Sequence, residues 1–123
     1  MLINVNPLIS PEILSLIRSM GHGDKLVLSD ANFPSYSQDN KLFRMDGLNV
    51  PEAAAALLTH FPLDSFIPHP VQRMEVDGQP DEINEVQKDL IDTVKKVSGD
   101  NWEVGSIERQ QFYVEAKKTM AVI

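Results

Sequence analysis

The sequence contains no cysteine, which excludes disulfides, thiolate nucleophiles and cysteine-bound metals and suits a reducing cytoplasm. Basic residues are scarce too, because 11 lysines and arginines stand against 18 aspartates and glutamates, for a formal charge of −7. Such a chain offers no basic surface to nucleic acid or anionic lipid. No apolar run approaches membrane-spanning length, and the N-terminus lacks the features of a signal peptide. We therefore expect a cytoplasmic protein that binds neither nucleic acid nor a membrane.

The length and the hydrophobic content fit one domain. The chain has 123 residues, of which 42% are hydrophobic, and this is enough to bury a sizeable core. Internal repeats, low-complexity stretches and long linkers are all absent from the sequence. We expect a single domain that covers residues 1–123.

Helix and strand patterns alternate along the chain. Ser10 and Pro11 are typical of a helix start, and Asp81 is a candidate cap for the longest helix. We expect four helices, over residues 10–20, 51–61, 81–97 and 108–118. We expect strands over residues 25–29, 42–45, 71–76 and 102–107 and from residue 120 onwards. A polar loop is expected over residues 32–40.

This alternation indicates an α/β fold. The strand at residues 25–29 has a continuous apolar centre, which is typical of a strand buried on both faces. We therefore expect a central, mostly parallel sheet flanked by helices on both faces. In such sheets ligands bind beyond the carboxyl ends of the strands, where Asp30 would lie.

His22 is the first candidate site residue. Gly21 and Gly23 flank it and allow a ligand to approach the backbone closely, and a nearby carboxylate such as Asp30 can orient an imidazole or bind a hydroxyl. Histidine exchanges protons near neutral pH and therefore suits acid–base catalysis. The alternative is a surface histidine at the end of a helix. The spacing alone leaves both interpretations open.

Arg109 is the second candidate, because it directly follows a predicted strand and its planar guanidinium can bind sugar hydroxyls or a carboxylate. A surface ion pair with Glu108 or Glu115 is the alternative. His60 and His69 show no metal-ligand spacing. Carboxylates at turns, such as those that a cluster with His22 would need, are more often caps, so we expect no metal site. No phosphate-binding glycine motif is present.

Several motifs together resemble the RbsD/FucU family, and they follow one another in the same order over nearly the whole chain. They are residues 7–12 (PLISPE), 20–24 (MGHGD), 29–34 (SDANFP), 46–48 (DGL) and Arg109 with Phe112 and Tyr113. Within this family, Gly23, residues 31–34 and Arg109 look more like the fucose branch than the ribose-pyranase branch.

The resemblance implies a three-layer fold and an L-fucose mutarotase, an isomerase that interconverts α and β anomers without a cofactor. It makes His22 the acid–base residue, and Asp30 and Arg109 substrate-binding residues. It also implies ring-shaped homodecamers whose sites are completed by a neighbouring subunit. The alternatives are a non-catalytic monosaccharide-binding protein accessory to sugar uptake, a ribose pyranase-like activity, and a structural oligomer with a vestigial pocket.

Family chains run on past the strand at residues 120–123 into a segment that supplies a tyrosine and an asparagine to the sugar site. We therefore expect that this sequence lacks a short C-terminal segment of the family domain.

Overall fold

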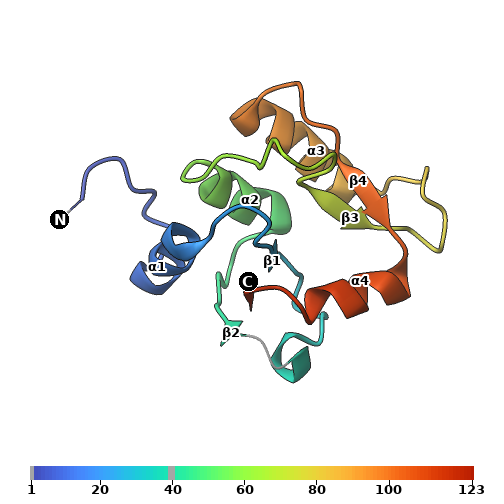
Figure 1. Cartoon of the computed structure of the whole chain (residues 1–123), viewed down its shortest axis with the longest axis horizontal. Helices are drawn as coiled ribbons and strands as arrows, with labels where there is room; N and C mark the ends of the chain where they lie inside the picture. The colour runs from blue at the N-terminus through green and yellow to red at the C-terminus, as the bar shows by residue number, and fades with distance from the viewer. Residues whose placement is uncertain (1, 39–40) are drawn as a thin grey trace.

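The computed structural model describes residues 2–38 and 41–123 and shows an α/β chain (Figure 1). The helices are α1 (Pro11–Ser19), the short 3-10 helix η1 (Ser35–Gln38), α2 (Val50–Leu58), α3 (Glu85–Ser98) and α4 (Arg109–Ala116). The strands are β1 (Leu26–Val27), β2 (Lys41–Leu42), β3 (Gln72–Met74), β4 (Gly105–Ile107) and β5 (Ala121–Val122). The expected fold class is confirmed. The loop predicted over residues 32–40 contains η1, and its last two residues lie outside the described part.

Local signals explain where the helices begin. The Ser10 side chain accepts a hydrogen bond from the Ile13 backbone N–H, as the predicted cap of α1 should. The Asp81 prediction was wrong, because α3 begins later and its cap is Asn84, whose side-chain oxygen accepts from the Gln87 N–H. Both residues suit a cap position chemically, and the chain enters the helix only at Glu85.

The central sheet has the order β1-β5-β2, and both pairings are parallel. Hydrogen bonds extend the β1–β5 pairing beyond the strand bounds, from the Lys25 carbonyl, which accepts from the Met120 N–H, to the Ser29 N–H, which donates to the Ile123 carbonyl. The last strand of the chain is therefore the middle strand of the sheet.

Helices cover both faces of this sheet. Ala121 and Ile123 of the β5 segment belong to one buried cluster with side chains from α1 and α2. Val122, which points to the opposite face, is fully buried with Ala116 of α4. The alternation along β5 thus produces three layers, with α1 and α2 on one side and α4 on the other (Figure 1).

The remaining strands form a second, smaller sheet, in which β3 and β4 pair in parallel. Gly105 of β4 lies against the His69 ring so closely that an added Cβ would approach the ring carbon Cγ to 2.9 Å. The other weak histidine candidate, His60, accepts a hydrogen bond from the Asn6 N–H at its Nε2 atom. Both histidines therefore have structural contacts. Among the described residues, no helix is long and apolar enough to cross a membrane.

Candidate functional site

A tight turn between α1 and β1 presents His22. The Asp24 carboxylate accepts a hydrogen bond from the Gly21 N–H at 2.8 Å, and the Asp24 N–H donates back to the Gly21 carbonyl at 3.1 Å. Gly23 has φ +83°, a left-handed conformation that other residues adopt only with strain. This turn leaves the His22 side chain 77% exposed.

Asp64 holds His22 from a distant part of the chain. Its Oδ1 atom lies 3.2 Å from His22 Nδ1, and its Oδ2 atom accepts from the Gly23 N–H at 3.1 Å. Because a carboxylate only accepts hydrogen bonds, this contact assigns a hydrogen to Nδ1 and leaves Nε2 for a ligand. The Asp64 side chain is only 19% exposed, so the imidazole contacts a mostly buried carboxylate.

Phe66 belongs to the same group of residues. Its N–H donates to Asp64 Oδ1 at 3.0 Å, and its ring meets the His22 ring edge to face, with centroids 4.8 Å apart. The Phe66 N–H is the largest cause that lowers the pKa of the Asp64 carboxyl, followed by the Gly23 N–H and His22. The carboxylate form is therefore the one that this site favours.

Asp64 and Phe66 are not among the candidate residues that the sequence indicated. The Asp64 side chain accepts a hydrogen bond from the backbone N–H of the residue two positions later, which makes an Asx-turn. An aspartate within a proline-rich segment is a usable sequence signal for such a turn. Such a turn indicates a fixed carboxylate, but it does not say which distant side chain that carboxylate contacts.

Asp30 forms a turn of its own just after β1. Its Oδ1 atom accepts from the Asn32 N–H at 2.9 Å and from the Phe33 N–H at 3.1 Å. The side chain is exposed, and these bonds fix its direction. The Asp30 turn thus presents a carboxylate at the carboxyl edge of the central sheet.

Aromatic contacts attach this turn to the helix that carries Arg109. The Phe33 ring stacks on the Tyr113 ring at 5.6 Å and meets the Phe112 ring edge to face at 5.9 Å. Phe112 and Tyr113 follow Arg109 by three and four positions, so all three share one side of α4. Arg109 and Asp30 therefore lie at the same end of the sheet.

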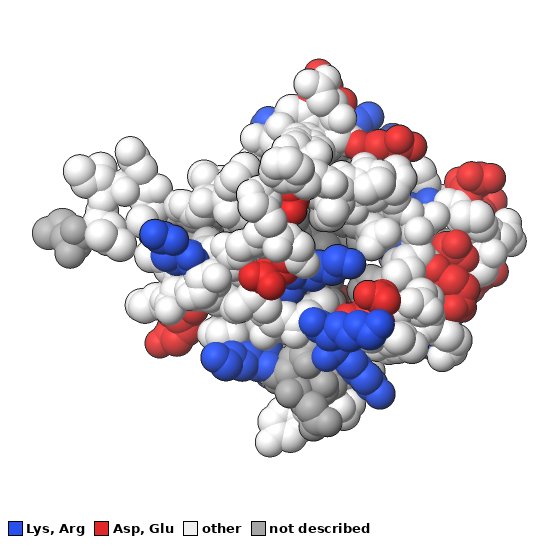
Figure 2. Space-filling model, in the orientation of Figure 1, with Lys and Arg blue, Asp and Glu red and all other residues white. Residues whose placement is uncertain are grey.

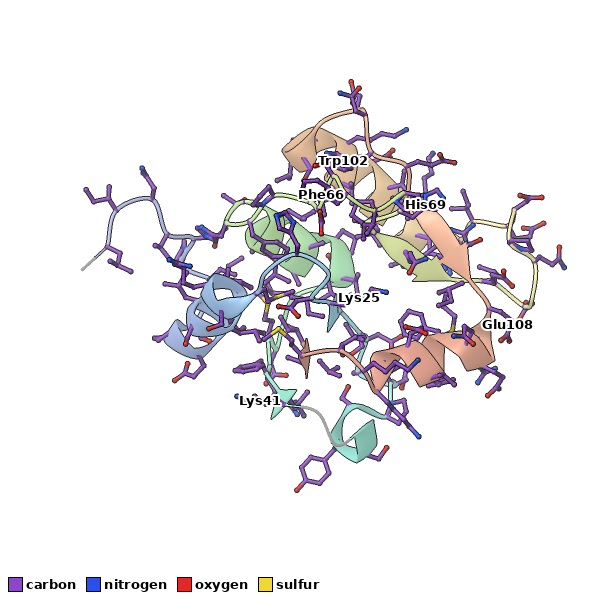
Figure 3. All side chains as sticks on the ribbon, in the orientation of Figure 1. Lys25, Lys41, Phe66, His69, Trp102 and Glu108 are labelled. Atoms are coloured by element: carbon purple, nitrogen blue, oxygen red, sulfur yellow. The ribbon has the colours of Figure 1, made fainter. Side chains whose placement is uncertain are left out.

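His22 lies at the opposite end. Lys25 and Ser29 delimit the extended ladder of β1, which covers roughly 13 Å at the usual strand rise. His22 precedes this ladder, and Asp30 follows it. The C-terminal end of α4 is on the His22 side, because Lys25 Nζ lies 4.0 Å from Glu115 Oε2. Figure 3 agrees, since Phe66 lies well apart from Glu108, the residue before Arg109.

A cavity of about 200 Å³ lies beside the His22 turn. It is lined by Gly23, Asp24, Lys25, Glu115, Lys118 and Met120. Figure 2 shows basic and acidic side chains close together near the centre of the face that is in view. A larger cavity of about 340 Å³ lies between the C-terminal ends of α2 and α3, and its lining includes none of the three predicted site residues.

Comparison with known proteins identifies the family. Residues 3–123 match the family described as the RbsD / FucU transport protein family. This chain belongs to that family.

Relatives of this RbsD/FucU family member match its sequence over the whole length of the chain. The L-fucose mutarotase of Actinobacillus pleuropneumoniae serotype 5b (strain L20) is 37% identical over 123 residues, which cover 100% of this chain and 85% of the relative. The fucose mutarotase from Streptococcus pneumoniae, solved in complex with L-fucose, has a TM-score of 0.86 and 37% identity. FucU from Bifidobacterium longum has a TM-score of 0.86 and 34% identity. Both structural alignments cover 98% of this chain and 86% of the other.

The RbsD/FucU family member thus carries two polar groups at opposite ends of one strand. One consists of His22 and Asp64, and it can exchange a proton through the exposed imidazole. At the other end lie Asp30 and Arg109, whose side chains can bind hydroxyls. Among the described residues, no group of three or more histidine, aspartate or glutamate side chains is arranged to hold a metal ion.

Proposed function

We propose that this protein is an aldose mutarotase that interconverts the α and β anomers of L-fucose. The observation that carries the proposal is the His22 imidazole, which Asp64 holds at Nδ1 while Nε2 stays open to a ligand. A relative that is 37% identical over this chain is named L-fucose mutarotase, and a solved structure with a TM-score of 0.86 is that of a fucose mutarotase in complex with L-fucose.

The reaction needs two coupled proton transfers. A proton is added to the ring oxygen and another leaves the anomeric hydroxyl, so that the C1–O5 bond breaks and the C1 aldehyde forms. Rotation about the C1–C2 bond and the reverse transfers then close the ring on the other face. His22 suits this cycle because an imidazole can donate a proton in one direction and accept it in the other. Asp30 and Arg109 would bind sugar hydroxyls.

The rival functions are not favoured. A protein that only binds a sugar needs no imidazole oriented by a carboxylate, yet here the His22–Asp64 contact leaves an acid–base atom exposed. Relatives that match this chain at 33–37% identity are named for L-fucose rather than for ribose.

We further propose that each site is built from two copies of the chain. A monosaccharide ring is much shorter than the roughly 13 Å of extended strand that separates His22 from Asp30. A sugar that contacts both must therefore take His22 from one copy and Asp30 with Arg109 from a neighbour. The homodecamer that the family resemblance implies would supply such neighbours. We place it in the cytoplasm because the sequence has no cysteine.

Replacement of His22 by glutamine tests the proposed activity. Glutamine keeps a polar side chain but cannot transfer the proton, so catalysed anomer exchange should fall by roughly 10²- to 10⁴-fold. NMR saturation transfer between the α and β anomers of L-fucose measures this rate on the full-length protein. Lys96→Gln, which changes an exposed residue of α3, is the control and should retain full activity. Unchanged exchange in His22→Gln would refute the mechanism.

A further inference from the structure

Phe66 is unusual among the phenylalanines of this chain. The residue is 80% exposed, whereas Phe33, Phe43, Phe61 and Phe112 are partly buried. An exposed aromatic ring leaves much apolar surface in water, which is unfavourable unless a ligand or partner covers it. Figure 3 shows Phe66 on the loop that follows α2.

The Phe66 ring is fixed beside the acid–base group. Asp64 accepts from the Phe66 N–H with the same oxygen, Oδ1, that contacts His22 Nδ1. The ring itself stands at 89° to the His22 ring, with 4.8 Å between centroids. A ligand that receives a proton from His22 therefore has the exposed part of the Phe66 ring next to it.

The chemistry of L-fucose puts an apolar group at that place. Carbon C5 carries both the ring oxygen, which must be protonated for ring opening, and the C6 methyl group. A residue that protonates the ring oxygen must therefore act close to this methyl. Hydrophobic contact with an aromatic ring removes the methyl from water.

We propose that Phe66 covers the C6 methyl of L-fucose and makes the enzyme prefer the 6-deoxy sugar to D-arabinopyranose. D-Arabinopyranose has the same configuration at C2, C3 and C4 and lacks only that methyl carbon, so the two sugars isolate the contact. This inference rests on the proposed mutarotase function and adds to it the residue that selects the substrate.

The test compares the two sugars on three forms of the full-length protein: unsubstituted, Phe66→Ala and Phe66→Leu. Saturation transfer gives kcat/KM for anomer exchange of each sugar. In Phe66→Ala we expect kcat/KM for L-fucose to fall roughly tenfold, which is the lower end of the range for the loss of one methyl contact. The value of kcat/KM for D-arabinose should change by less than about twofold. Phe66→Leu keeps an apolar contact and should retain most of the preference.

Each other outcome overturns the inference. Equal losses on both sugars would mean that Phe66 acts through His22 and not through the methyl. No loss on either sugar would mean that the ring does not contact the substrate. If the unsubstituted protein exchanges neither sugar, the proposed function itself fails, and this inference fails with it. Thermal unfolding of both variants checks the fold, which an exposed side chain should affect little.

Discussion

Asp64 joins three parts of the candidate site through one carboxylate. It contacts the His22 ring and accepts from the backbone N–H groups of Gly23 and Phe66. The two backbone hydrogen bonds fix the carboxylate relative to the main chain. The carboxylate in turn fixes the direction of the imidazole. A fixed donor direction is what proton transfer to a bound sugar requires.

These hydrogen bonds predict the direction of an acid-dependent loss of stability. The Phe66 N–H first, then the Gly23 N–H and His22, lower the pKa of the Asp64 carboxyl below its ordinary value of 3.8. A lowered pKa in the folded protein contributes stability above the ordinary pKa, and that contribution disappears as the pH falls through the lowered pKa. Carbon-detected NMR titration of the Asp64 carboxyl should therefore give a midpoint below 3.8.

The matching stability measurement uses Asp64→Asn. The variant should unfold at a lower temperature than the unsubstituted protein at neutral pH, and the difference should shrink in the acid range as Asp64 becomes protonated. A difference that stays the same through this range would show that the carboxylate charge does not matter.

Asp64→Asn should also slow anomer exchange. The amide can still occupy the site, but it can present its NH₂ group to Nδ1 and no longer stabilises a protonated imidazole. We expect a loss of roughly ten- to a hundredfold, less than the loss of the acid–base group itself. Saturation transfer on L-fucose measures it, and Asp92→Asn on the exposed face of α3 is the control. Equal rates in the two variants would contradict a role for Asp64.

At the scale of single residues, the sequence pointed to His22, Asp30 and Arg109 but not to their contacts. Asp64 is 42 positions from His22, and nothing in a single sequence pairs two side chains at that separation. The assigned roles of the three residues stay predictions, because the contacts of His22 and Asp30 show what holds these side chains and not what they bind.

At the scale of elements, the turn at residues 21–24 decides where His22 points. Gly23→Ala forces an ordinary side chain into φ +83° and should cost about 1 kcal/mol of stability. A steric clash of the alanine methyl group with other residues is not the cause, because nothing lies within 4 Å of a Cβ at this position. The temperature of thermal unfolding and the rate of L-fucose anomer exchange should both fall.

Gly21→Ala is the matched control for this turn. Its φ is not in the left-handed region, and its Cβ would meet only Asp24 Oδ2, at an ordinary contact distance of 3.9 Å. We therefore expect this neighbour to tolerate alanine. Similar losses in the two variants would show that side-chain bulk, and not backbone conformation, matters in the turn.

The elements themselves were predictable wherever their signals are local. Ser10 and Pro11 predict the start of α1 from adjacent residues alone, and the predicted start is confirmed. Asn84 and Asp81 are chemically similar caps, so local chemistry could not choose between them. The pairing of β1 with β5 joins strands from opposite ends of the chain, and pattern alone does not give that partner.

At the scale of the whole molecule, the sheet separates the two halves of the proposed site. The β1–β5 ladder keeps His22 and Asp64 at its amino end, and Phe33 keeps the Asp30 turn against α4 at its carboxyl end. The sequence placed Asp30 beyond the strand and made it a candidate partner for the His22 imidazole, but the carboxylate that contacts His22 is that of Asp64. An extended strand between two residues makes them neighbours in sequence and distant in space.

A mixing experiment tests whether two copies build one site. His22→Gln and Arg109→Gln should each be inactive alone, yet random assembly after co-expression should restore about a quarter of the sites, because half of the chains supply each intact residue. Unsubstituted chains co-expressed with the double variant should also give about a quarter, whereas a site within one chain would give about a half. Exchange of L-fucose anomers measures both mixtures, and sedimentation confirms that the chains assemble. Assembled but inactive mixtures of the two single variants would show that each chain holds a complete site, because only then does every site carry one of the two defects.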